Sequence, residues 1–199
     1  MTLSRRNLML GLSGSALLAA MPTLSFALTP QAAETLVRQV AADITRTINS
    51  GRSETQLYGD FEQIFERYAD VPTIARYSLG AAARGVSASD MRAYTAAFSH
   101  YISRKYGRRF REFIGGEIVV QGSRTEKTMV IVNSVAKLRG ESPIKVEFLL
   151  SDQSGRAAFF NVIIEGVNML TTERTEIGAL LDQQGGSVSK LTQRLQATS

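Results

Sequence analysis

Two residues could act as an acid or a base, His100 and Glu165. His100 is the single histidine of the sequence. It lies about 200° around a predicted helix from Phe98, opposite the apolar side of that helix, and sequence spacing puts no nucleophile or carboxylate beside it. We therefore expect a solvated surface histidine. Glu165 follows the apolar segment 159–164, and burial there would raise its pKa and make it a candidate base. A hydrogen-bonded turn carboxylate is the alternative.

Other catalytic chemistry has no motif in this sequence. There is no Cys, which excludes thiol nucleophiles, disulfides and cysteine metal sites. No acid–histidine spacing resembles a metal site, and Gly115-Gly116 follows a predicted helix where a phosphate-binding loop would precede one. We expect no enzyme activity, no metal and no cofactor.

The N-terminus is typical of an export signal. Ser4 to Leu8 has the twin-arginine form with Arg5 and Arg6, an apolar segment 8–18 follows, and small residues precede a cleavage point after Ala27. A membrane anchor, the alternative, needs about 20 apolar residues, and Gly and Ser interrupt this segment. We expect residues 1–27 to be a removed signal peptide and residues 28–199 to form one exported domain.

Charge gives little support for a nucleic-acid partner. The formal net charge of the whole sequence is +5. Residues 1–27 carry two of its bases, Arg5 and Arg6, and no acids, so the exported part is only mildly basic. Binding to nucleic acid is accordingly not expected.

Helical patterns come first along the exported part. Thr29-Pro30 and Ser53 to Gln56 are helix starts, the second a capping box. Asp70-Val71-Pro72 begins a short helix that ends at Gly80. Ser87 to Asp90 begins the longest helix, whose apolar residues recur at a period near 3.6 as far as Phe113.

Strand patterns follow, and they set the predicted fold class. Segments 117–123, 128–138, 143–151 and 156–164 are rich in Val, Ile and Phe and are joined by short turns, as in antiparallel hairpins. Within the last segment, residues 159–164 are nearly all apolar with no polar residue on alternate positions, which predicts a strand covered on both faces. Helices over 172–184 and 187–196 close the chain. Together these predict an α+β domain, a curved antiparallel sheet of about four strands with helices packed over its concave face.

Apolar residues of the longest helix and of the sheet could face each other. The helix contributes Phe98, Tyr101 and Ile102, and the sheet contributes Val130, Val132, Val146, Phe148, Phe160 and Val162. An ordinary packed core and a ligand cavity need the same residue types, so the pattern alone leaves both open.

The sequence resembles the MlaC family, also called the toluene-tolerance or Ttg2 family, over roughly residues 36–195. The residues that carry the resemblance are Val162, Glu165-Gly166-Val167, Met169-Leu170, Arg174 and Leu180-Leu181, with an earlier block of Leu79-Gly80, Arg84, Phe98 and Tyr106. The order and spacing of these residues, more than any one motif, make the similarity.

The resemblance implies a cone-shaped NTF2-like fold and a function. Members of this family are periplasmic phospholipid carriers that serve outer-membrane lipid asymmetry. The chain would be a monomer that exchanges lipid with an outer-membrane lipoprotein complex and an inner-membrane ABC transporter carrying an MCE-domain ring. Bound phospholipid would be cargo and no cofactor would be needed. An isomerase or dehydratase on a similar fold, with Glu165 as base, is the alternative.

The resemblance also favours a lipid pocket over a packed core as the interpretation of the apolar residues. Its expected lining is Ile74, Leu79, Phe98, Tyr101, Ile102, Val130, Val132, Val146, Phe148, Phe160 and Val162. Arg104, Arg108 and Arg111 stand at i, i+4 and i+7 on one predicted helix, with Lys105 flanking them. This basic stripe could dock a partner, lie near the lipid phosphate, or be a solvated face, and all three remain open.

Overall fold

The computed structural model describes residues 28–108 and 113–198. The predicted signal segment 1–27 lies outside these residues, as does Arg111 of the basic stripe. In chain order the described elements are α1 (Pro30–Ile48), α2 (Glu54–Tyr68), α3 (Val71–Leu79), the 3-10 helix η1 (Gly80–Gly85), α4 (Ala88–Gly107), β1 (Glu117–Glu126), β2 (Met129–Lys137), β3 (Ile144–Ser151), β4 (Ala158–Ile164), β5 (Val167–Asn168), α5 (Met169–Gln183) and α6 (Val188–Gln196).

The strands form one open antiparallel sheet, which confirms the predicted α+β class. Their order is β1-β2-β3-β4-β5, so each strand pairs with its sequence neighbours. The sheet has one strand more than predicted, the two-residue β5. It returns along the end of β4 through a tight turn in which Glu165 and Gly166 both have positive φ, 48° and 80°.

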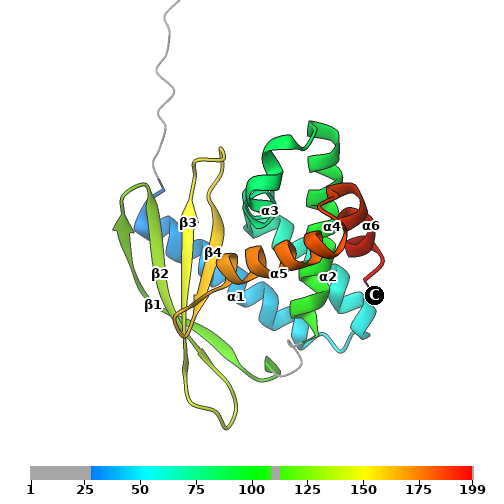
Figure 1. Cartoon of the computed structure of the whole chain (residues 1–199). Helices are drawn as coiled ribbons and strands as arrows, with labels where there is room; N and C mark the ends of the chain where they lie inside the picture. The colour runs from blue at the N-terminus through cyan, green and yellow to red at the C-terminus, as the bar shows by residue number, and fades with distance from the viewer. Residues whose placement is uncertain (1–27, 109–112, 199) are drawn as a thin grey trace, which may run out of the picture.

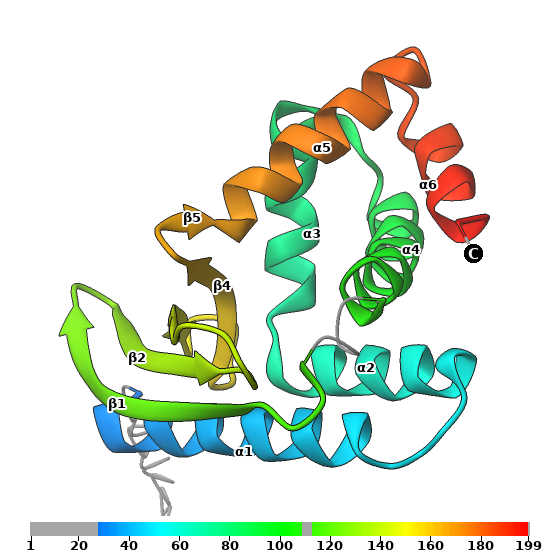
Figure 2. The same cartoon turned by 90° about the horizontal axis from the view of Figure 1, so that it is seen from below.

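The molecule divides into two halves, which Figure 1 shows side by side. The sheet half consists of the sheet and α1, and α1 lies across one face of the sheet. The helical half consists of α2 to α6 and η1. Figure 2 shows α1 running alongside β1 and α5 crossing from β5 to α6.

Most helix starts are confirmed, and one is wrong. Thr29 caps α1, and Ser53 with Gln56 makes the capping box of α2. The last long helix, α5, begins at Met169 rather than at residue 172. Its cap is Asn168, whose side chain accepts a hydrogen bond from the Thr171 amide at 3.0 Å. An amide side chain at this position satisfies the free backbone N–H as well as the expected hydroxyl would.

The longest helix is shorter than its apolar period suggested. Helix α4 ends at Gly107, whereas the pattern predicted a helix as far as Phe113. A side chain at Gly107 would meet the ring of Tyr58 at 2.7 Å, so this end of α4 packs closely on α2. None of the helices in the described ranges is long and apolar enough to cross a membrane.

Candidate functional site

Two apolar clusters meet between the halves, and Phe159 of β4 belongs to both. The sheet cluster lies between α1 and the sheet, and the helical cluster lies among α3, α4, α5 and α6. The Phe159 ring lies 6.0 Å from the ring of Phe148 on the sheet side and 6.3 Å from the ring of Phe65 on the α2 side. We call this contact between the two clusters the aromatic seam.

The expected pocket residues divide between the clusters. The sheet cluster holds Val130, Val132, Val146 and Phe148 with the half-buried Val162, and the helical cluster holds Ile74, Leu79, Phe98, Tyr101 and Ile102 with the half-buried Phe160. The long helix was expected to face the sheet, and this is wrong. Helix α4 packs against α2, α3 and α6, and α1 covers the sheet instead. The prediction failed because α1 has an apolar face of its own, with Val37 and Val40 buried.

Phe160 and Val162 were expected on one face of β4, and the structure separates them. Leu150 of β3 pairs with Phe159, whereas the next residue back, Leu149, pairs with Asn161. Phe160 is therefore the extra residue of a β-bulge, which reverses the alternation of side chains along the strand. Phe160 packs on the helical cluster, and Val162 packs on the sheet cluster beside Phe159. Both faces of the strand are covered here, as expected.

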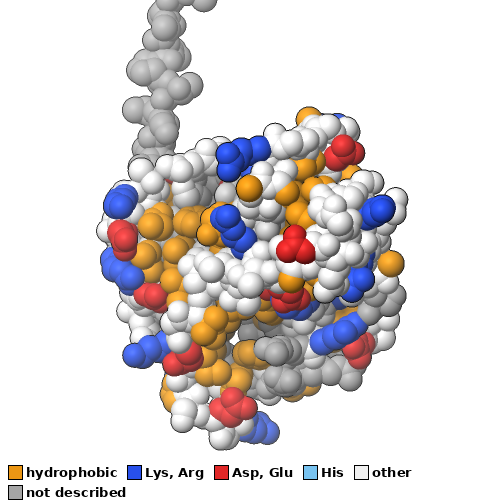
Figure 3. Space-filling view, viewed as in Figure 1, with side chains coloured by type: hydrophobic (Ala, Val, Ile, Leu, Met, Phe, Trp, Pro, Cys, Tyr) orange, Lys and Arg blue, Asp and Glu red, His pale blue; other side chains and the backbone are white. Residues whose placement is uncertain are grey.

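A hollow opens on the surface of the molecule. Figure 3 shows it below α5, near the start of β1, with hydrophobic side chains on its border. Ile164 and Val167, at the β4–β5 turn, are 37% and 54% exposed, and Ile114, which precedes β1, is 56% exposed. Large apolar side chains so exposed are expected at an interaction site or at the rim of a ligand cavity.

A separate groove of about 700 Å³ lies between α1 and the start of β1. Its lining includes Arg38, Thr45 and Ile118, and none of the expected pocket residues contributes to it. This groove is open, so it lacks the enclosure that an apolar ligand needs.

A cluster of charged and phenolic groups lies within the helical half, and sequence reasoning missed it. Glu173 of α5 is 4% exposed. Its Oε1 accepts hydrogen bonds from Lys105 Nζ at 2.7 Å and from the Tyr106 hydroxyl. Lys105 also pairs with Glu176, which accepts a further hydrogen bond from the Tyr101 hydroxyl. Lys105 thus bridges two carboxylates and ties α4 to α5.

Burial and pairing shift the pKa values in this cluster. Burial, together with hydrogen bonds to carboxylates, raises the pKa of Tyr101 and of Tyr106. Burial alone would raise the pKa of the Glu176 carboxyl, but hydrogen bonds from Lys105 and Tyr101 outweigh it and lower that pKa below 4.5. These tyrosines are held as neutral donors, which suits structural anchoring.

A sequence signal for this cluster did exist. Leu170, Glu173, Ile177 and Leu181 stand at i, i+3, i+7 and i+11, which places them on one helix face. A glutamate within an apolar stripe must be desolvated on folding and therefore needs a partner. Lys105 holds the corresponding position on α4, since it follows Tyr101 and Ile102 by one turn.

The basic stripe does not form a single free surface. Lys105 points into the cluster. Arg104 donates to the Thr198 carbonyl at 3.2 Å, and its guanidinium lies 6.0 Å from the centre of the Tyr58 ring. Arg108, at the end of α4, is exposed. Arg104 and Lys105 of the stripe are therefore engaged within the molecule.

The two acid–base candidates have local partners. His100 Nδ1 lies 3.1 Å from Glu62 Oε2, so it is paired with α2 rather than solvated alone. The carboxylate of Glu165 accepts a hydrogen bond from the Lys145 amide, and its own amide donates to the Lys145 carbonyl at 3.0 Å. Glu165 is exposed and holds the β4–β5 turn to β3, as the turn interpretation requires. No group of three or more potential metal ligands occurs in residues 28–108 and 113–198.

Most of the chain matches a known protein family. A family model described as MlaC protein matches residues 36–197. The chain belongs to the MlaC family. The matched range includes both halves and the seam, so the MlaC assignment covers almost all of the described structure.

A solved structure of similar shape supports the assignment at the level of the fold. A phospholipid-binding protein from Ralstonia solanacearum, in complex with a phospholipid, superposes with a TM-score of 0.70. It is 17% identical, and the match covers 82% of this MlaC-family chain and 94% of that protein. At that identity the similarity shows a shared fold.

Proposed function

We propose that this MlaC-family chain is a periplasmic phospholipid carrier that encloses the acyl chains of one lipid in the apolar seam between its halves. The observation that supports the proposal best is the meeting of two apolar clusters at Phe159, between the halves. The similar fold of a phospholipid-binding protein adds to it. No step in this function changes a covalent bond, so we propose that the chain is not an enzyme.

The energetics of acyl chains explain why a carrier must enclose its cargo. Each methylene kept from water contributes about 0.8 kcal/mol. Two chains of about 15 methylenes each would therefore cost on the order of 20 kcal/mol if exposed. The open groove against α1 could not offset that cost, whereas a cavity opened along the seam could. Transfer between membrane and carrier is then nearly balanced, because one apolar surrounding replaces another.

Partners follow from the family. We propose exchange of lipid with an outer-membrane lipoprotein complex and with an inner-membrane ABC transporter carrying an MCE-domain ring, in support of outer-membrane lipid asymmetry. Phospholipid is the cargo, and no cofactor is proposed. The enzyme alternative based on Glu165 loses its main support, since this carboxylate is exposed and bonded within a turn.

Native mass spectrometry of the purified chain tests the carrier function. We expect a bound mass that matches a two-chain phospholipid, which is lost on delipidation and regained when the chain is incubated with phospholipid vesicles. A chain that is purified without lipid and takes up none from vesicles would contradict the proposal.

Export can be tested separately. We propose that the twin-arginine segment directs the chain to the periplasm. Lysine keeps the charge but lacks the planar guanidinium, so Arg5→Lys with Arg6→Lys should leave the precursor unprocessed in the cytoplasm. Cell fractionation checks this, and normal periplasmic yield of the double variant would indicate the general secretory route.

A further inference from the structure

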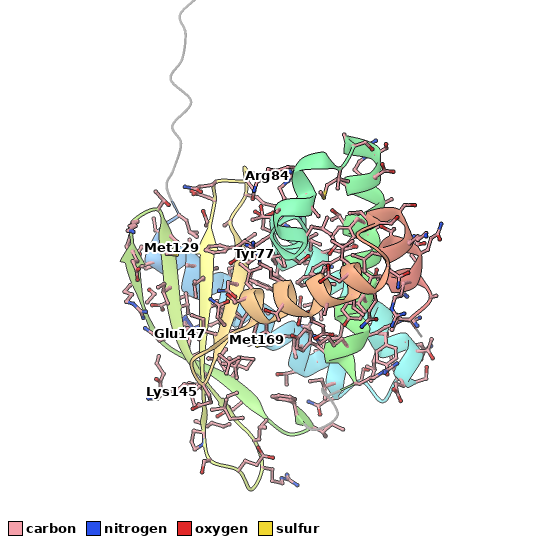
Figure 4. All side chains as sticks on the ribbon, in the orientation of Figure 1. Tyr77, Arg84, Met129, Lys145, Glu147 and Met169 are labelled. Atoms are coloured by element: carbon pink, nitrogen blue, oxygen red, sulfur yellow. The ribbon has the colours of Figure 1, made fainter. Side chains whose placement is uncertain are left out.

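One face of the sheet is not covered by α1. Lys145 and Glu147 alternate along β3 with residues of the sheet cluster, so their side chains point away from α1. Figure 4 shows Lys145, Glu147 and Met129 on this side, with Met169 and Tyr77 bordering it from the helical half. We call this surface, together with Arg84 and Arg174, the open face.

Arg174 is held in a fixed position at the helical border of the open face. Its guanidinium lies 5.1 Å from the centre of the Tyr77 ring. On another side it packs against Gly80, where a Cβ atom would come within 3.1 Å of the guanidinium. Gly80 has φ 57° and ψ −127°, a conformation that other residues adopt only with strain. Gly80 and Arg174 belong to the two separate sequence blocks that carry the family resemblance, and the fold brings them into contact.

Arg174 and Arg84 carry charge that no described carboxylate neutralises. Both side chains are exposed, and neither has a carboxylate within salt-bridge distance in the described part of the chain. Of the acids on this face, Glu147 is already paired with Arg124 at 3.0 Å, and Glu126 is the cross-strand partner of Met129. The open face therefore carries net positive charge around an aromatic ring that is 38% exposed.

The residue types of the open face are those of a protein interface. Tyr, Met and Arg are enriched at such interfaces, and Arg and Tyr are frequent among the residues that contribute most to binding. A guanidinium held flat on a ring has already lost much of its conformational freedom, and its planar donors match a carboxylate with two hydrogen bonds. Attraction to an anionic bilayer needs charge but no such fixed geometry.

We propose that the open face is a docking surface for a protein that presents carboxylates, with Arg174 and Arg84 as its charged contacts and Tyr77 as its central ring. The proposal rests on the carrier function and names the surface through which the carrier meets a membrane complex. It replaces the basic stripe of α4 in that role, because Arg104 and Lys105 are engaged within the molecule.

The test measures binding of the purified chain to two detergent-solubilised complexes from the same organism, the transporter with its MCE-domain ring and the outer-membrane lipoprotein complex. We expect Arg174→Gln with Arg84→Gln to weaken binding to at least one complex by about tenfold or more, as loss of strong interface contacts does. Gly80→Ala should weaken the same complex, because a methyl group displaces the guanidinium. Arg194→Gln removes an exposed charge from α6 and is the matched control.

Bound lipid, measured by native mass spectrometry, keeps the two proposals separate. Variants that retain lipid but bind the membrane complex more weakly support the open face as a docking surface, because the carrier function is then intact. Equal binding of wild type, double variant and control to both complexes would overturn the open face as a docking surface. Binding to vesicles of phosphatidylglycerol and phosphatidylethanolamine that is lost in the double variant, with complex binding unchanged, would assign the face to membrane lipid and also overturn it. A wild-type chain that never carries lipid would overturn the carrier function instead.

Discussion

The two halves bury their residues in different chemical surroundings. In the sheet half, the side chains between α1 and the sheet are mainly apolar, with Ser134 of β2 as a buried polar exception. In the helical half, a lysine and two glutamates lie on the same helix faces as the apolar residues, and two tyrosine hydroxyls bond to them. Phe159 packs against both clusters, so the apolar and the charged surroundings lie on opposite sides of the seam.

This difference indicates how a seam could hold lipid and still close. Acyl chains offer no hydrogen bonds, so the wall they contact should carry no polar group that needs one. The sheet half supplies such a wall except at Ser134 of β2, whose buried hydroxyl has no hydrogen-bond partner within the described residues. Charged pairs contribute little net stability when buried, but they restrict which arrangements of helices are acceptable. The helical half is therefore suited to keep α4 and α5 in register when the seam is empty.

The largest expected effect tests the sheet side as the lipid wall. Val162→Asp places a carboxylate toward the sheet cluster, where loading a lipid would require its desolvation. We expect the folded variant to retain about tenfold less lipid than wild type, or none, by native mass spectrometry. Ile163→Asp is the matched control, because its side chain points to the other face of β4. Equal retention by both variants would show that the sheet side does not contact the acyl chains.

The next effect compares a packed phenylalanine with one at the seam. Phe98 is fully buried, and Phe98→Ala should lower the free energy of unfolding by about 3–5 kcal/mol. Phe160 is half-buried in the bulge, so Phe160→Ala should cost only about 1–2 kcal/mol in delipidated protein. Urea unfolding of both variants checks this. A Phe160→Ala loss as large as that of Phe98→Ala would mean that the seam is closed core.

The charged cluster gives a smaller expected effect with a distinctive pattern. Lys105→Met leaves Glu173 buried without its cation, which typically costs about 3–5 kcal/mol for a fully buried pair. Because the Lys105 side chain is 25% exposed, we expect a loss nearer 2–3 kcal/mol. Adding Glu173→Leu should restore most of it, since both charges are then absent. A double variant as unstable as the single one would mean that Glu173 is important for packing rather than for charge.

Periodicity and capping predicted most of the secondary structure, because those signals are local. The capping box at Ser53 and the strands of the hairpins depend on residues close in sequence, and they lie where expected. Which helix covers the sheet depends on contacts far apart in sequence. Both α1 and α4 carry apolar stripes, and nothing in either stripe identifies its partner surface.

The candidate site was predicted in composition more than in arrangement. The expected apolar residues are buried or half-buried, but a single bulge residue, Phe160, reverses the side-chain alternation on which their common face depended. Bulges insert without changing composition, so a period-two pattern cannot show them. Glu173 was missed for a different reason. Its partners Tyr106 and Lys105 lie on α4, 67 and 68 residues earlier in the chain.

The smallest expected effect concerns pH and the exposed edge of the charged cluster. The pKa of Glu176 is lowered in the folded protein by Lys105 and Tyr101, against the effect of burial. A carboxyl with a lowered folded pKa stabilises the fold above its unfolded pKa, and this contribution is lost as pH falls through the folded value. Wild type should therefore exceed Glu176→Gln in stability above about pH 4.5, and the difference should shrink below it.

Urea midpoints of both proteins between about pH 6 and about pH 3 measure that difference. Glu126→Gln, at the exposed end of β1, corrects for the general effect of removing a negative charge. The side chain of Glu176 is 40% exposed, so solvent screens the pair and the effect stays small. A difference that is constant across the range, or equal to that of Glu126→Gln, would mean that Lys105 is held by Glu173 alone. Glu176 would then add nothing to the Lys105–Glu173 pair. The contribution of the charged cluster to the stability of the helical half would not change with pH in this range.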